Sequence, residues 1–177
     1  MDKHPAAADA ACPMSRALER VGELWSTLIL RDAFDGLKRF DQFEKSLGIA
    51  PNILARRLNM LVKEGLLERR QYCQHPPRFE YLLTARGRDY WPVLLTLMAW
   101  GIKHFSPDGA TMVLVDSTTG ATVDAVLVDA GSGKPINDRE HFYVAGPAAS
   151  EGLRQRMARR AAHSDSTPAT PQPRSDT

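Results

Sequence analysis

Residues 47–84 constrain the fold of this chain more than any other segment. Their sequence is LGIAPNILARRLNMLVKEGLLERRQYCQHPPRFEYLLT. Apolar residues recur at helical spacing across residues 51–64, and a glycine follows. Two strand-like runs, residues 66–71 and 79–83, then flank a polar tip that contains Pro76 and Pro77. The predicted order is therefore a helix, a strand, a stiff hairpin and a second strand.

The expected helix over residues 51–64 has two chemically different faces. Leu54, Leu58 and Leu61 lie at positions i, i+4 and i+7, which predicts that they face the core. The opposite face combines amide and basic side chains: Asn52, Arg56, Asn59 and Lys63. A helix of this kind followed by a hairpin is the order of a winged helix-turn-helix, which places one helix in a DNA groove and a hairpin beside it.

Helices are also expected on both sides of this segment. Residues 13–21, 24–34 and 39–47 carry apolar side chains at helical spacing. Thr84 is suited to cap a following helix, which runs over residues 85–105 with a kink at Pro92. The predicted fold class is α+β, mainly α: a winged helix-turn-helix domain with a C-terminal dimerisation helix and a small β-rich appendage.

Residues 90–105 are apolar on nearly every side. A helix of that kind requires burial all round, which a domain of about 100 residues does not provide for its last helix. A second copy of the chain is the simplest cover, and a homodimer is therefore expected. The alternative is that the acidic C-terminal segment covers the helix. Candidates for the dimer interface are Trp91, Leu94, Leu97, Met98, Ile102 and Phe105.

The character of the sequence changes after Pro107. Residues 111–116, 122–129 and 140–145 resemble strands separated by turns, which predicts a hairpin or a three-stranded appendage. No internal repeat is evident. The expected domains are a flexible N-terminus (1–11), the DNA-binding domain (12–106), the β-rich appendage (107–147), and a basic helix followed by a disordered tail (148–177).

Charge is distributed unevenly along the chain. Residues 38–78 contain nine basic and four acidic residues, whereas residues 107–147 contain two basic and six acidic residues. The basic block predicts a surface that binds a polyanion. There is no apolar stretch long enough to span a membrane and no signal peptide, and only two cysteines are present. A cytoplasmic protein is expected, with no membrane partner.

Several motifs in order give the chain a resemblance to HxlR-type regulators, a branch of the MarR-like winged-helix group. They are Cys12-Pro13, VGELW, ILRD, Arg39-Phe40, the helix and hairpin described above, and the Trp100 helix. The resemblance covers residues 12–105 and implies a homodimeric regulator of operator DNA, many of its members being repressors. Some members sense oxidants or electrophiles through the N-terminal cysteine. The appendage has no cysteine, so no metal role is assigned to it.

The DNA-contacting candidates fall into two groups. Asn pairs well with adenine and Arg with guanine, so Asn52, Arg56 and Asn59 are the candidate base readers, while Arg57 is expected to point partly toward the DNA backbone. Phosphate contacts supply affinity and salt dependence rather than sequence preference. The candidates for that role are Arg39, Lys63, Arg70 and Arg78, and His75 could reach a phosphate or the minor groove from the wing tip.

Cys12 is the candidate redox sensor, because a helix N-terminus stabilises a thiolate. The alternative is a small residue that packs at the dimer interface. The effector therefore stays open between an oxidant and a small molecule. No catalytic constellation, cofactor motif or metal-ligand spacing is present, so an enzyme is not expected. The rival to a transcriptional regulator is a winged-helix adaptor that binds proteins and no DNA.

Overall fold

A computed structural model describes residues 12–138 and 140–164 of the chain. The described residues fall into two compact units, one of which is Ala17–Pro135. The other unit combines the described residues on either side of that range. The candidate DNA-binding elements all belong to the first unit.

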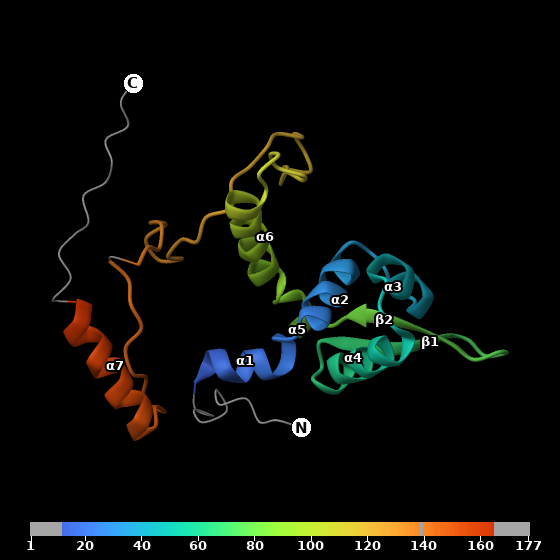
Figure 1. The fold of residues 1–177 in the computed structure, drawn as a ribbon, viewed down its shortest axis with the longest axis horizontal. Coiled ribbons are helices and arrows are strands. Elements are labelled where there is room, and N and C mark those ends of the chain that lie inside the picture. The colour runs from blue at the N-terminus through green and yellow to red at the C-terminus, as the bar shows by residue number, and fades with distance from the viewer. Residues whose placement is uncertain (1–11, 139, 165–177) are drawn as a thin grey trace. The chain divides into compact units, whose positions relative to one another are not determined.

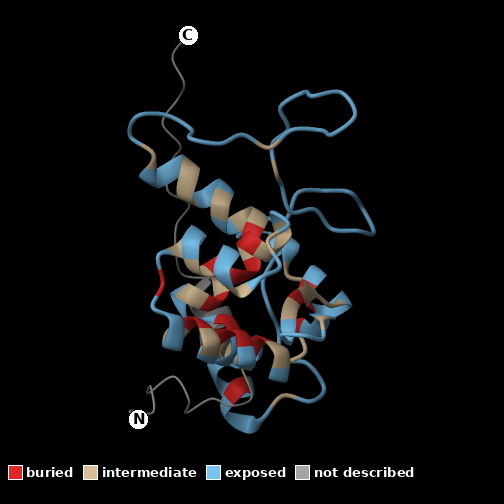
Figure 2. Cartoon of the chain, turned by 90° about the vertical axis from the view of Figure 1, so that its right-hand side faces the viewer, coloured by how far each residue is buried: buried red, intermediate tan, exposed pale blue. Residues whose placement is uncertain are grey.

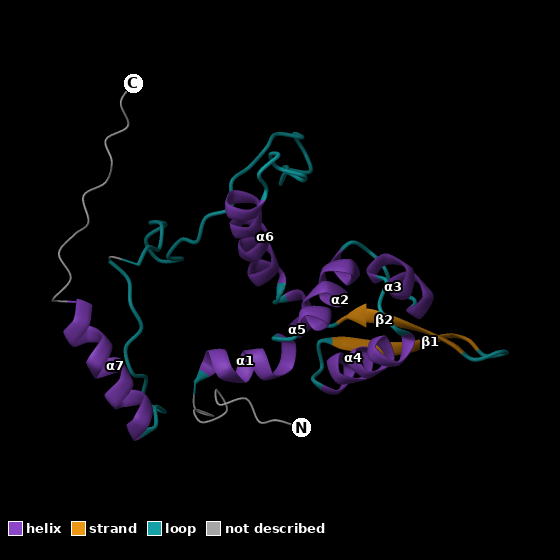
Figure 3. Ribbon diagram, in the orientation of Figure 1, coloured by secondary structure: helices purple, strands orange, loops and turns teal. Residues whose placement is uncertain are grey.

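The structure is mainly helical with one small sheet, which confirms the predicted α+β, mainly α class with a winged helix-turn-helix domain (Figures 1 and 3). The expected helices before the hairpin are all present, with ends that differ by one residue at most. In chain order the elements are α1 (Pro13–Val21), α2 (Leu24–Phe34), α3 (Phe40–Leu47), α4 (Pro51–Lys63), β1 (Leu67–Cys73), β2 (Arg78–Leu83), α5 (Ala85–Arg88), α6 (Trp91–Phe105) and α7 (Glu151–Ser164).

The sheet consists of β1 and β2, paired antiparallel with Leu67 opposite Leu83. An irregularity between Gln71 and Cys73 marks the end of the regular ladder near the tip. The segment before α3 adds a short third edge, because the amide of Tyr81 donates to the carbonyl of Lys38 at 2.7 Å. This contact holds the hairpin of β1 and β2, which we call the wing, against the segment that leads into α3.

The core lies between α2, α3, α4 and the sheet. Ile29 and Leu30 of α2 and Phe43 of α3 are completely buried. The leucine face of α4 is buried as predicted, and Leu54, Leu58 and Leu61 all have 0% exposure. Burying a side chain of this size contributes roughly 1.5–3 kcal/mol. In Figure 2 the buried positions concentrate in this helical part, whereas the loops are almost uniformly exposed.

The single helix expected over residues 85–105 is wrong, because the chain forms two helices there. α5 ends at Arg88 and α6 begins at Trp91. A proline in a helix removes one hydrogen bond and its ring collides with the carbonyl four residues earlier. For Pro92 that carbonyl belongs to Arg88, so the helix stops there and Pro92 occupies the first turn of a new helix. The predicted cap is confirmed: the Thr84 hydroxyl accepts from the amide of Gly87 at 3.0 Å.

The three expected strands of the appendage are also wrong. Within residues 107–138 and 140–147 the structure has only two isolated bridges, Val115–Thr122 and Val128–Pro135. The third strand-like run, residues 140–145, contains turn and irregular backbone. Nearly all of these residues are exposed. A two-stranded hairpin without an apolar layer beneath it is marginally stable, so strand-like sequence is insufficient for strands here.

One turn of the appendage is organised by Asp116. Its Oδ1 atom accepts from the amides of Thr118 and Thr119 at 2.9 and 2.8 Å and from the Thr119 hydroxyl at 3.0 Å. The Thr119 amide contributes most to holding the pKa of Asp116 below its ordinary value. Gly120 follows at φ 71°, a left-handed conformation that glycine adopts without strain.

The same turn occurs a second time around Asp129. Its carboxylate accepts from the amides of Gly131 and Ser132 and from the Ser132 hydroxyl, the last at 2.6 Å. Gly133 follows at φ 70°. Each turn carries the pattern Asp-x-x-Thr/Ser-Gly and lies between the two residues of one of the bridges. The appendage is therefore a duplicated turn, although no repeat was evident in the sequence.

α7 confirms the helix that the sequence predicts over residues 151–162. The disordered tail was expected over residues 163–177, but α7 extends to Ser164. The rest of that tail and the N-terminal segment expected to be flexible, residues 1–11, lie outside the described residues. Among the described helices none is both long and apolar enough to cross a bilayer. The described residues also contain no group of three or more His, Cys, Asp or Glu side chains that could hold a metal ion.

Candidate nucleic-acid interface

The exposed face of α4 presents a row of polar and basic side chains. Asn52, Arg56, Asn59 and Lys63 are all exposed, as their spacing predicts. Arg56, Asn59 and Lys63 have no side-chain partner within residues 12–138 and 140–164. The Asn52 carbonyl oxygen accepts from the amide of Ile53 at 2.9 Å, which leaves its NH2 group to donate elsewhere. This face therefore offers several hydrogen-bonding groups to an external partner.

The entry to α4 is built by a tight turn after α3. Gly48 adopts φ 59° and lets the chain reverse between the two helices. Pro51 occupies the first turn of α4, where its missing amide hydrogen costs nothing. Ala50 precedes it and supplies no capping side chain. The amides of Ile53 and Leu54 already donate to the Ala50 carbonyl, so the amide of Asn52 is the backbone donor of this turn for which the described residues supply no acceptor. An anion beside this helix N-terminus would be stabilised.

The wing is rich in positive charge. Arg70 pairs with Glu80 at 2.7 Å, yet its side chain remains 62% exposed. The guanidinium of Arg39 lies 4.8 Å from the ring centroid of Tyr72, which joins the start of α3 to β1. His75 and Arg78 are exposed. In Figure 1 the tip of this hairpin projects beyond α3 and α4, where it can reach a ligand bound to α4.

Arg57 is the one DNA-contact candidate that the structure does not bring to this surface. The residue is 7% exposed, and its Nη2 atom pairs with the carboxylate of Glu23. Its Nη1 atom lies 3.9 Å from the sulfur of Met60. The sequence contained a signal for this position, because Arg57 is three residues after Leu54 and four before Leu61. That spacing places it on the buried face of α4.

Sequence reasoning missed two arginines near the interface. Arg69 is exposed and its guanidinium lies 3.7 Å from the Phe79 ring centroid. Because it neighbours Arg70 in β1, its side chain points to the opposite face of the hairpin. Arg86 donates to the carbonyl of Glu64 at 3.0 Å and so caps the last turn of α4. No local sequence pattern predicts that contact, because the two residues come together only in the folded chain.

The thiol of Cys12 lies directly before α1. The residue is half-buried, and its pKa is lowered from 9.0 to about 7. The causes are, in order, the backbone amide of Ser15, the side chain of Arg156 and the Ser15 hydroxyl, which all stabilise the thiolate. The second thiol, Cys73, lies in the wing with its sulfur 3.7 Å from the carbonyl oxygen of His75. Both thiols are free.

The predicted dimer residues divide between the core and the surface. Leu94 is 2% exposed within the chain's own core, and Met98 packs against the same core. Ile102 is half-buried. Trp91, Leu97 and Phe105 are exposed, as are two residues that were not predicted, Val93 and Trp100. These five residues form the uncovered apolar surface of α6.

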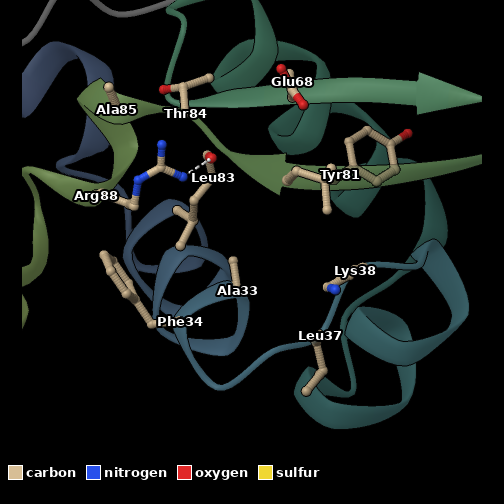
Figure 4. A pocket seen from close by; sticks show the side chains of 11 residues that line it. Ala33, Phe34, Leu37, Lys38, Glu68, Tyr81, Leu83, Thr84, Ala85 and Arg88 are labelled. Carbon is tan, nitrogen blue, oxygen red and sulfur yellow. Dashed lines mark hydrogen bonds between the residues drawn. The ribbon is translucent and has the colours of Figure 1, made fainter.

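A pocket of about 570 Å³ lies beside the sheet, between α2 and the start of α5 (Figure 4). Its charged side chains are Lys38, Glu68 and Arg88, and Arg88 donates to the Leu83 carbonyl at 2.7 Å. The pocket contains no residue from α4. It is lined by Ala33, Phe34, Leu37, Lys38, Glu68, Tyr81, Leu82, Leu83, Thr84, Ala85 and Arg88.

Comparisons with known proteins identify a family and several similar proteins. The family model HxlR-like helix-turn-helix matches residues 20–108. An uncharacterized HTH-type transcriptional regulator of Mycobacterium tuberculosis strain H37Rv, Rv3095, is 42% identical over 135 residues, which cover 76% of this chain and 85% of that protein.

Two solved structures are similar over most of the chain. One is PA1374 of Pseudomonas aeruginosa, described as a candidate transcription factor, with 50% identity and a TM-score of 0.59. The match covers 82% of this chain and 99% of PA1374. The other is PA1607, described in the same terms, with 39% identity and a TM-score of 0.71. That match covers 80% of this chain and 99% of PA1607.

Proposed function

This chain belongs to the HxlR-like helix-turn-helix family, and on that premise we propose that it is a DNA-binding transcriptional repressor that acts as a homodimer. The observation that carries the proposal is the exposed row on α4, in which the Asn52 side-chain oxygen alone has a hydrogen-bond partner among the described residues. Such a row suits the major groove, where each base pair presents a distinct set of donors and acceptors.

Three residues of the row are proposed to contact bases. Arg56 can donate two hydrogen bonds to guanine, and Asn52 and Asn59 can each make paired hydrogen bonds with adenine. Each such pair contributes roughly 1–3 kcal/mol of discrimination against a wrong base. Arg57 is excluded from this set because it is buried and paired with Glu23. The operator preference therefore rests on side chains from about two turns of one helix.

The remaining exposed cations are proposed to contact phosphates. They comprise Lys63 at the end of α4, Arg39 before α3, and Arg70 and Arg78 in the wing, with His75 at the wing tip. The Arg70–Glu80 pair does not prevent this role, because the Arg70 side chain stays 62% exposed and Glu80 takes only some of the five N–H donors of its guanidinium. These contacts orient the protein on the duplex and make binding depend on salt.

The uncovered apolar surface of α6 supports the homodimer. Two copies related by a two-fold axis would present two α4 helices to half-sites about 34 Å apart, one turn of DNA. The effector is proposed to be an oxidant or electrophile that modifies Cys12, because a pKa of about 7 leaves a large thiolate fraction at neutral pH. The alternative effector is a small molecule that binds in the pocket beside α2. The DNA-binding assay described next distinguishes the two by comparing the native protein with Cys12→Ser.

Fluorescence anisotropy with the DNA upstream of the protein's own gene tests the proposal. We expect specific binding that weakens steeply with salt, and Arg56→Ala should weaken operator binding by about 1–3 kcal/mol. Arg154→Ala, which removes an exposed arginine from α7, is the matched control and should bind normally. Oxidant should release DNA from the native protein and not from Cys12→Ser. Absence of DNA binding at low salt would favour the protein-binding adaptor instead.

A further inference from the structure

The buried position of Arg57 separates it from its neighbours on the DNA-facing helix. Arg56 is exposed, whereas Arg57 has 7% exposure and pairs with the carboxylate of Glu23. Its Nε atom is buried without a hydrogen-bond partner among the described residues. Glu23 is thus the only carboxylate that neutralises this guanidinium in the described part of the chain. The cation depends on one residue outside α4.

Glu23 lies at the corner where α1 meets α2. It is the residue before α2 and follows Gly22, and its side chain remains 59% exposed. The same corner makes a second ion pair with α4, because Nε of Arg20 lies 3.0 Å from the carboxylate of Glu64. One pair holds the middle of α4 and the other its C-terminal end. The two pairs together restrict both the tilt and the rotation of the helix.

We infer that Glu23 and Arg57 form a positioning pair that sets operator specificity without touching DNA. The inference rests on the proposed function, in which Asn52, Arg56 and Asn59 contact bases. Specificity then depends on the position in which α4 is held as well as on the exposed side chains that contact bases. Arg57 then acts through its neighbours, since any rotation of α4 moves Arg56 and the two asparagines together.

The physical reason is that the guanidinium cannot remain buried alone. If Glu23 loses its charge, a buried cation is left uncompensated, which is strongly unfavourable. Arg57 must then leave the interior, and α4 must shift or rotate to release it. Hydrogen bonds to base edges require a donor–acceptor distance near 2.9 Å and good alignment, so they are lost first. Phosphate contacts tolerate such movement because they act largely through charge.

The test is the ratio of operator to random-DNA affinity in Glu23→Gln. We expect this ratio to fall about tenfold, as is typical of coupled residues. Binding to random DNA should stay unchanged or become stronger, because the variant loses a negative charge and exposes a positive one. Glu19→Gln is the matched control, since Glu19 contacts Arg20 only at 3.9 Å and lies on the same corner. It should keep the native ratio.

A double variant separates positioning from direct contact. In Glu23→Gln/Arg57→Met the buried charge is gone and an apolar chain of similar length fills its place, which buried sites tolerate well. We expect the specificity ratio to recover toward that of the native protein. Thermal unfolding of each variant, followed by circular dichroism, checks that the comparison is between folded proteins.

Two results would overturn the inference. One is an unchanged ratio in Glu23→Gln, including the case in which operator and random-DNA affinity fall equally. The other is a double variant that discriminates worse than Glu23→Gln, which would mean that Arg57 itself contacts DNA. If the native protein binds operator and random DNA equally, the proposed function fails and this inference fails with it.

Discussion

The sulfur of Cys12 is surrounded by groups that favour its charged form. The Ser15 amide at the start of α1 is the largest contributor, followed by Arg156 and the Ser15 hydroxyl. Burial opposes them only weakly. Because the pKa is depressed, the thiolate is favoured above about pH 7 and is lost as the pH falls through that value. One backbone amide and two side chains, from α1 and α7, therefore favour the reactive form of this residue.

The rate at which iodoacetamide alkylates Cys12 should report the pKa of its thiol directly. In a Cys73→Ser background, where Cys12 is the remaining thiol, we expect the rate to rise with pH around a midpoint of about 7. Arg156→Gln should move the midpoint to higher pH, because one of the groups that stabilises the thiolate is lost. A midpoint near the ordinary value of 9.0 in the parent protein would show that the groups do not act on the sulfur as described.

At the scale of elements, the spacing of apolar residues was sufficient to predict a helix wherever one of its faces is buried and the other exposed. α4 has that character, so its bounds, core leucines and exposed row could be predicted from the sequence. The position of Arg57 was within reach of the same reasoning, since it shares a face with Leu54 and Leu61. Its partner was not, because Glu23 meets it only through the packing of α2 against α4.

The two incorrect elements failed for different physical reasons. The helix over residues 85–105 was expected to bend at Pro92, and the structure instead ends α5 at Arg88 and starts α6 at Trp91. Local sequence does not distinguish a kink from a break. The appendage carries strand-like residues but no layer to bury them against, so its order depends on side-chain turns around Asp116 and Asp129 instead.

The junction of α5 with β1 requires a glycine. A Cβ atom at Gly87 would lie 2.1 Å from the carbonyl oxygen of Leu66 and 3.1 Å from a methyl group of Leu83. Because backbone blocks the space, Gly87→Ala should lower the free energy of unfolding by about 1–3 kcal/mol or more, the usual effect of overpacking. Urea titration followed by circular dichroism measures this change.

Gly152→Ala is the comparison for that variant. Gly152 lies in α7, and an added Cβ atom there would meet nothing within 4 Å. Alanine favours a helix over glycine by about 0.5–1 kcal/mol, so this variant should be neutral or slightly more stable. Equal destabilisation by both substitutions would contradict the steric explanation for Gly87.

At the scale of the whole molecule, the uncovered apolar surface of α6 is the main feature that one chain leaves unsatisfied. Leu97 is 49% exposed and Trp100 is 54% exposed, in a helix whose other side packs on the core through Leu94. Apolar side chains grouped in this way typically mark an interface. The proposed dimer would cover them and would also fix the distance between the two α4 helices.

Leu97→Asp should therefore weaken the dimer. An aspartate in the middle of an apolar interface is expected to cost about 2 kcal/mol or more, equivalent to roughly a 30-fold rise in the dimer dissociation constant. Sedimentation velocity measures the dissociation constant, and operator affinity should fall in parallel because both half-sites must be occupied. Val126→Asp, which changes an exposed apolar residue of the appendage, should leave the dimer intact. A Leu97→Asp protein that sediments as the native one does would exclude α6 as the interface.

The break between α5 and α6 has a mechanical consequence. Asp89 and Tyr90 join the DNA-binding module to α6 without belonging to either helix. A change of angle at this joint would exchange the bonds that Asp89 and Tyr90 make to the ends of α5 and α6, while the hydrogen bonds in the rest of α6 are kept. In a two-fold dimer built on α6 the same change occurs in both copies and adds. A rotation of a few degrees at Asp89 and Tyr90 would then move each α4 helix, and would move the end of α4 farther from the joint by the larger distance. The spacing of the two α4 helices would no longer match one turn of DNA.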